Sequence, residues 1–108
     1  MTAPRLKESH IHKAVVAHWK IAGKPGTLVA TIPNMGAFGQ NGLTKGLPDL
    51  IVIGPGVHGY IELKTETGKL SQPQREFQAL CSIHNIKFAV THGRDEPIQV
   101  LKEWGIVA

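Results

Sequence analysis

The sequence has few of the features that mark secreted, membrane or zinc-binding proteins. It contains one cysteine, Cys81, which excludes an internal disulfide and a cysteine-rich zinc site. No apolar run approaches the roughly 18 residues that a membrane-spanning helix needs. Residues 1–8 also lack the apolar core of a secretory signal. We therefore expect a protein of a reducing compartment that makes no contact with a membrane.

Two further kinds of site have little support. The sequence has no Gly-rich phosphate loop ending in Lys-Ser or Lys-Thr, so we expect no nucleotide cofactor. Of its six histidines, His10 and His12 are two residues apart, which places them on different faces of a helix. The other four are scattered along the chain. This spacing does not favour a structural zinc site.

What remains is a chain typical of a small globular domain with a basic surface. Its 108 residues, 42% of them hydrophobic, are enough for one domain over residues 1–108 with a modest core. The formal net charge of +4 is a mild tilt toward polyanionic partners such as nucleic acid.

The spacing of apolar residues predicts an α/β fold. A stripe formed by Ile11, Val15 and Trp19 predicts the first helix, which Gly23 ends. A helix between the third and fourth strands permits a parallel crossover and hence a mixed four-stranded sheet flanked by helices, in the order αβββαβα. The predicted helices span 8–22, 71–85 and 96–104, and the predicted strands span 27–32, 49–53, 59–64 and 87–91.

The central pair of strands carries acidic residues in apolar surroundings. Residues 54–59 are rich in glycine and predict a hairpin with a six-residue loop. Glu62 and Lys64 share one face of their strand, and Asp49 lies at the mouth of the other. Pairing would gather two carboxylates and an ammonium, which suits a hard cation. The alternative is an ordinary turn followed by an edge strand with solvated charges.

The second helix has a clear start and a predicted inner face. Ser71 and Gln74 have the spacing of a capping box. We expect Cys81 to be a small buried apolar residue and not a nucleophile. Asp95 is expected to cap the third helix. The predicted inner stripe of the second helix is Phe77, Leu80, Cys81 and His84.

Two other segments have both a structural and a functional interpretation. Glu8, in the first turn of the first helix, suits the helix dipole whether or not it binds a ligand. Residues 33–46 contain four glycines and form either a simple connector or a phosphate-binding loop. The side chains that would contact phosphates there are Asn34, Gln40, Asn41 and Lys45.

Four ordered features together resemble the VRR-NUC branch of the PD-(D/E)xK nuclease superfamily. They are Glu8 on the first helix and the segments 46–50 (Gly-Leu-Pro-Asp-Leu), 62–64 (Glu-Leu-Lys) and 68–74 (Gly-Lys-Leu-Ser-Gln-Pro-Gln). The resemblance implies a restriction-endonuclease-like core. It also implies catalytic roles for Asp49, Glu62, Lys64 and Gln74, and a Mg²⁺ site, with Mn²⁺ as a substitute, formed by Glu8, Asp49, Glu62 and the main-chain carbonyl of Leu63.

By this resemblance we expect a structure-selective endonuclease that cuts branched DNA such as Holliday junctions. It would act as a homodimer in the cytoplasm of a bacterial or phage-infected cell. Apolar residues Met35 and Phe38, or residues 104–107, would serve the dimer. The alternatives are a non-catalytic DNA-binding module and a sequence-specific restriction endonuclease. Related sequences often have a longer helical insert in the 33–46 region, which puts contacts from there in doubt. The expected DNA-binding residues are Asn34, Lys45, Lys69 and Arg94.

Overall fold

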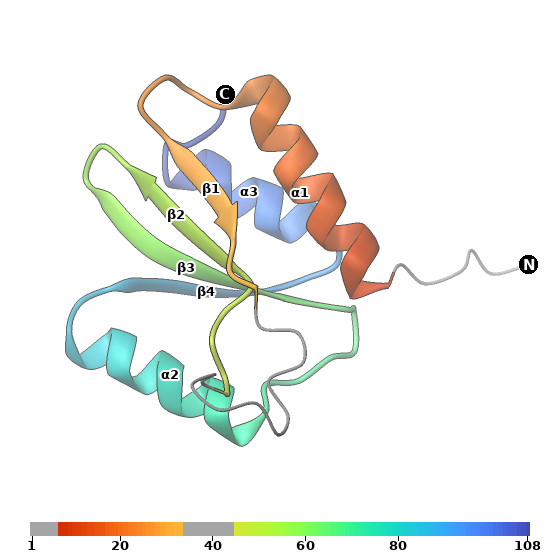
Figure 1. The fold of residues 1–108 in the computed structure, drawn as a ribbon, viewed down its shortest axis with the longest axis vertical. Coiled ribbons are helices and arrows are strands. Elements are labelled where there is room, and N and C mark those ends of the chain that lie inside the picture. The colour runs from red at the N-terminus through yellow and green to blue at the C-terminus, as the bar shows by residue number, and fades with distance from the viewer. Residues whose placement is uncertain (1–6, 34–44) are drawn as a thin grey trace, which may run out of the picture.

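The computed structural model describes residues 7–33 and 45–108, which form a mixed sheet with three helices (Figure 1). The order αβββαβα is the one predicted from the sequence. The elements are α1 (Glu8–Ala22), β1 (Leu28–Thr31), β2 (Leu50–Gly54), β3 (Val57–Lys64), α2 (Gln72–Ile83), β4 (Lys87–His92) and α3 (Asp95–Glu103).

The four strands lie in the order β1-β2-β3-β4. The first three pair antiparallel, and β4 pairs parallel to β3 after the crossover through α2. In consequence the end of β1, the start of β2 and the ends of β3 and β4 meet at one edge of the sheet. The polar residues singled out in the sequence lie at this edge.

One face of the sheet is covered by α1 and α3 and forms the hydrophobic core (Figure 1). Ile11 and Val15 of α1 are fully buried there, as the predicted stripe requires. They pack with Ile61 of β3 and Leu101 of α3, which are also inaccessible to solvent. Removing this apolar surface from water is the main favourable term in folding.

The opposite face is covered in part by α2. The ring of Phe77 packs edge-on against Tyr60 and tilted against Phe88, and Cys81 is buried as predicted. The rest of the predicted inner stripe is wrong, because Leu80 is 56% exposed and His84 is exposed. The helix meets the sheet over a narrow strip and so buries fewer positions than a helix over a broad core.

The predicted six-residue hairpin loop is also wrong. Gly54 pairs with Val57, so Pro55 and Gly56 alone make the turn. The glycines and proline of residues 54–59 indicate a turn, but Val57, His58 and Gly59 belong to β3. Gly59 lies within β3, where a Cβ would come within 2.8 Å of the Lys87 Cβ. A glycine in a strand can mark such a close approach.

The C-terminal segment belongs to the core. Ile106 is fully buried, Val107 is 2% exposed, and Val107 forms a β-bridge with Gly23. The prediction of an exposed surface for a dimer is therefore wrong for Ile106 and Val107, whereas Trp104 is half-buried. Met35 and Phe38 lie outside the described residues.

The ends of the last helix differ slightly from prediction. Asp95 is the first residue of α3, and Arg94 takes the cap position that was predicted for Asp95. Within the described residues, none of the helices has the length and apolar character needed to cross a bilayer.

Candidate active site

The antiparallel register of the central strands brings the predicted acidic residues together. Leu50 pairs with Ile61, which places Asp49, just before β2, opposite Glu62, the next residue on β3. Lys64 follows on the same face of β3 and ends the strand. The hairpin predicted from the sequence thus gathers these three residues, although its loop is shorter than expected.

Hydrogen bonds from the main chain of neighbouring segments hold both the side chain and the main chain of Asp49. Its Oδ2 accepts a hydrogen bond of 2.7 Å from the Leu63 amide, and its carbonyl accepts one of 2.8 Å from the Ile32 amide. In a strand, the N–H and C=O of one residue point to the same side. The carbonyl of Leu63 therefore faces the side of β3 where Asp49 lies, as its predicted role as a ligand requires.

Glu62 is the most unusual residue of the site because it is an ionisable residue that is only 2% exposed. Its Oε1 accepts a hydrogen bond of 3.1 Å from Gln74 Nε2 and lies 3.8 Å from Lys64 Nζ. Its Oε2 is buried and has no hydrogen-bond partner in the described part of the chain. Such an orphaned oxygen is costly unless something else satisfies it.

The environment of Glu62 opposes its ionisation. Burial is the largest cause that raises its pKa to about 9. A hydrogen bond that the protonated Glu62 would share with the Asp49 carboxylate comes next, followed by the charge of that carboxylate. The Lys64 ammonium acts in the opposite direction, and Glu8 adds a further small increase. A cation bound between the carboxylates would reverse this balance by favouring the charged form.

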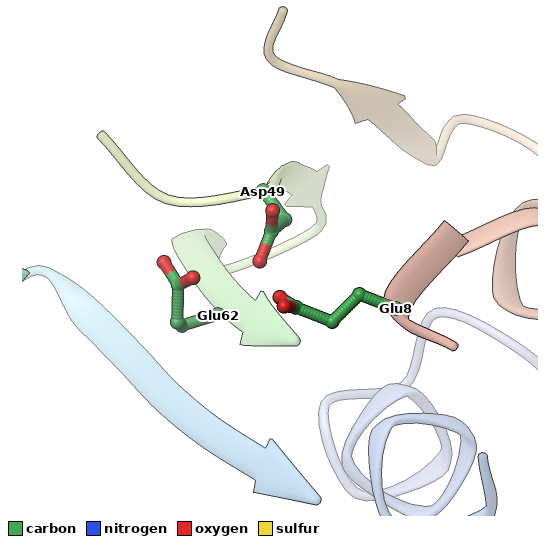
Figure 2. Close-up of side chains that lie close together, drawn as sticks. All are labelled: Glu8, Asp49 and Glu62. Atoms are coloured by element: carbon green, nitrogen blue, oxygen red, sulfur yellow. The ribbon is translucent and has the colours of Figure 1, made fainter. Parts of the chain in front are cut away.

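A third carboxylate reaches the same point from α1. Glu8 is exposed and begins the helix, whose next turn is anchored by the buried Ile11. Figure 2 shows its side chain extending from α1 toward the Asp49 carboxylate, with Glu62 beyond. One oxygen from each of the three side chains lies within 4.8 Å of the others. This spacing suits a single metal ion with oxygen ligands.

Lys64 is held by the polypeptide that follows β3. A Cβ on Gly68 would lie 3.2 Å from the Lys64 Cβ, so a larger residue there would require the loop or the Lys64 side chain to shift. The loop is tied down by His92, whose Nε2 lies 2.9 Å from the Gly68 carbonyl. The Lys64 side chain is 11% exposed.

The start of α2 contributes Gln74 through the predicted capping box. The Ser71 side chain accepts from the Gln74 amide, and Gln74 Oε1 accepts a hydrogen bond of 2.8 Å from the Ser71 amide. The other end of the same amide group donates to Glu62. Gln74 therefore joins the cap of α2 to the acidic cluster, which agrees with both roles considered from the sequence.

The glycine that opens the Gly-x-Pro-Asp segment has a packing role. Gly46 has φ +85° and lies against the first turn of α2, where a Cβ would be 2.5 Å from the carbonyl carbon of Pro73. Larger residues are excluded both by the left-handed conformation and by the contact. Gly46 thus fixes the segment that leads to Asp49 against the helix that carries Gln74.

These groups surround a pocket of about 490 Å³ that also contains residues the sequence did not indicate. His12 Nε2 lies 3.1 Å from Thr31 Oγ1, and Ser9 lies beside them. A signal was available for His12, because it is four residues after Glu8 and hence on the same side of α1. Nothing in the sequence indicates that Thr31 lies nearby.

The predicted DNA-binding residues lie around the same edge of the sheet. Lys45 is exposed beside Gly46, and Lys69 is exposed shortly before α2. Arg94 is exposed after β4, and its Nε lies 3.9 Å from the Asp95 carboxylate. Their contact with DNA stays a prediction. Asn34, Gln40 and Asn41 lie outside the described residues.

Comparison with known proteins agrees with this fold. The family model of the VRR-NUC domain matches residues 22–95, a range that includes Asp49, Glu62, Lys64 and Gln74 but begins after Glu8. A solved VRR-NUC domain protein has a TM-score of 0.78 at 20% identity, over 94% of this chain and 90% of its own.

A second solved structure, of a VRR-NUC domain, has a TM-score of 0.67 at 21% identity, over 90% of this chain and 96% of its own. At these identities the two likenesses show a common fold. No curated protein is significantly similar in sequence.

Proposed function

Because this chain belongs to the VRR-NUC domain family, a family of nuclease-type domains, we propose that it is a metal-dependent endonuclease that hydrolyses phosphodiester bonds in branched DNA. One observation carries the proposal. Three carboxylates meet in a pocket beside Lys64, and one buried oxygen of Glu62 has no hydrogen-bond partner in the described part of the chain. The likeness to solved VRR-NUC domains supports the fold on which the site depends.

The residues present fit a divalent cation with oxygen ligands, for which Mg²⁺ is the expected ion and Mn²⁺ the substitute. Asp49, Glu62 and Glu8 would hold it, together with the carbonyl of Leu63. The orphaned Oε2 of Glu62 would gain a partner. Bound there, the cation would neutralise phosphate charge and lower the pKa of a bound water.

The chain itself would orient the reactants. Lys64, whose amine lies 3.8 Å from Glu62 Oε1, would hold a phosphate oxygen and position the attacking water. Gln74 would keep the Glu62 carboxylate in place through its 3.1 Å hydrogen bond.

The choice of branched DNA follows from the family resemblance and from what the described chain contributes. Every helix and strand in residues 7–33 and 45–108 belongs to the sheet or packs on it, so this part adds no separate base-reading domain. We propose a homodimer that makes paired cuts across a junction, in the cytoplasm of a bacterial or phage-infected cell. Twofold symmetry would supply two sites of the same kind.

A nuclease assay tests the proposal against its alternatives. Four-way junction, flap, single-stranded and linear duplex DNA would be incubated with Mg²⁺, Mn²⁺ or EDTA. We expect paired cuts in the junction with either metal and none in EDTA. Binding without any cutting would favour the non-catalytic module, and cutting of linear duplex at one sequence would favour the restriction endonuclease. Sedimentation of the protein alone and with a junction would test the dimer.

Variants assign the roles. Asp49→Ala and Lys64→Ala should abolish cutting and retain binding to the junction. Lys102→Ala, which changes an exposed lysine of α3 outside the pocket, is the control and should cut like the wild type. Cutting at the wild-type rate by either site variant would show that the proposed roles are wrong.

A further inference from the structure

A second groove adjoins the proposed active site and has a different character. It has a volume of about 460 Å³ and is lined by one side of α1, from Ser9 to Lys20, and by Thr31. Ser9, His12 and Thr31 line both this groove and the catalytic pocket. The two hollows are therefore continuous at the start of α1.

The groove is lined by aliphatic residues in its middle and by a lysine on either side of them. Val16 and Ala17 lie between Lys13 and Lys20, which are both exposed. These residues recur at helical spacing on a side of α1 that does not carry the buried Val15. No carboxylate lines the groove within the described residues. The groove thus offers apolar surface together with positive charge.

We propose that this groove binds the DNA arm that leaves the active site beside the scissile phosphate. The inference rests on the proposed function and specifies where its substrate lies. Phosphates would contact the amines of Lys13 and Lys20, and sugars or unpaired bases would lie against Val16 and Ala17. A strand held at the acidic cluster reaches this surface by passing Ser9 and His12.

The length of the groove sets the length of the arm. Ser9 and Lys20 are eleven residues apart, which corresponds to about 16 Å along a helix. Duplex DNA rises about 3.4 Å per nucleotide along its axis, so the groove spans about five nucleotides. Substrates trimmed below about five nucleotides on this side of the cut should bind less well than longer ones.

Charge complementarity favours DNA over an apolar peptide as the occupant. The two lysines would each release a counterion on contact with phosphate, which makes binding depend on salt. An apolar peptide would gain nothing from them. The salt dependence of binding therefore distinguishes the two occupants directly.

A binding experiment in Ca²⁺ and in EDTA tests the charges separately from cutting. Lys13→Gln/Lys20→Gln would be compared with Lys87→Gln/Lys102→Gln, which removes the same charge outside both hollows. We expect the first pair to weaken junction binding on the order of tenfold and to reduce the slope of log K against log salt by about 1.8, or 0.9 for each lost contact. Equal effects of the two pairs would overturn the inference.

A crosslinking experiment locates the arm. Because Cys81 is 2% exposed, Ala17→Cys would carry the accessible thiol for attachment of a photoreactive group. We expect crosslinks to nucleotides within about five positions of the cut on one side. The exposed Gln99→Cys on α3 is the control and should give none. Crosslinks from both positions, or from neither, would overturn the inference.

The two proposals fail in different ways. A wild-type protein that binds and crosslinks as expected but does not cut would remove the proposed activity and leave the groove. A protein that cuts, with the Lys13 and Lys20 double variant binding like the wild type, would remove the groove and leave the activity. Absence of any DNA binding by the wild type would overturn both.

Discussion

The two faces of the sheet bury residues of opposite character, apolar on one face and ionisable on the other, and β3 contributes to both. Ile61 and Leu63 point into the core under α1 and α3, whereas Glu62 and Lys64 point to the face shared with α2. All four are buried, with exposures of 0%, 1%, 2% and 9% in that order. Burial stabilises the fold on the first face and opposes it on the second, because charged groups lose hydration there.

The difference shows how a small domain can keep ionisable groups buried at an unfavourable free energy. The apolar face is closed by two helices, and the polar face only by the narrow contact of α2. Leu28 and Ile53, a cross-strand pair on the polar face, remain 42% and 41% exposed. The stability that the first face supplies therefore has to offset the cost of the second.

The largest expected effect comes from substituting one residue on each face of β3. Glu62→Gln should reduce cutting by at least about 1,000-fold, or about 4 kcal/mol, because a neutral amide is a poor ligand for a divalent cation. It should not lower the stability of the metal-free protein at pH 8, because it removes a buried acid. Cutting rates and thermal unfolding in EDTA measure the two effects.

Ile61→Ala is the matched change on the other face. It should lower the free energy of unfolding by about 2–5 kcal/mol through lost burial and a cavity, and reduce cutting only as far as folding is lost. If Glu62→Gln destabilised the metal-free protein as much as Ile61→Ala, the proposed contrast between the faces would be wrong.

The pH dependence of stability should show the same contrast between the faces. The pKa of Glu62 is about 9 in the fold, against 4.5 for the free side chain. The group therefore contributes full stability below about pH 4.5, and this contribution is lost as the pH rises through 9. The melting temperature of the metal-free protein should fall over this range, and that of Glu62→Gln should fall less.

Metal should change the same curve. Because a ligand carboxylate has to be deprotonated, Mg²⁺ competes with the proton on Glu62. The rise in melting temperature on adding Mg²⁺ should therefore increase from pH 6 to pH 9. If the rise in melting temperature is independent of pH, or is also present in Glu62→Gln, then Glu62 does not bind the metal.

The sequence predicted the regular parts of both faces. Ile11 and Val15 follow a helical period, and Glu62 and Lys64 follow the strand period of two. These regularities are local, and together with the family resemblance they were enough for the order αβββαβα and for the meeting of Asp49 with Glu62. Local patterns were sufficient where an element's own residues decide its burial.

Most of the failures depended on contacts between distant residues. Gly59 packs against Lys87 of β4 within the sheet, and the exposure of Leu80 depends on how little of the sheet α2 covers. Val107 is buried through its bridge to Gly23. Nor does sequence spacing show that Thr31 lies near His12. Tertiary packing determines the position of each of these residues, and the periodicity of the sequence does not predict it.

The smallest expected effect concerns Gln74, which connects the two functions within one amide group. Ser71→Ala removes the side-chain half of the capping box and leaves the hydrogen bond from Gln74 to Glu62. Gln74→Ala removes both. Each should cost about 0.5–2 kcal/mol of stability, as lost caps do. Only Gln74→Ala should also slow cutting, by roughly tenfold, because one charge-assisted hydrogen bond is worth about 1.5 kcal/mol or more.

Gln74→Glu sharpens the test, because a carboxylate still accepts the hydrogen bond from the Ser71 amide but cannot donate to Glu62 when ionised. It should keep most of the cap and yet cut less well than Ser71→Ala. Melting curves and cutting rates of the three variants separate the two roles. If all three cut at the wild-type rate and differ only in melting temperature, Gln74 belongs to the helix alone, and the contact with Glu62 carries no part of catalysis.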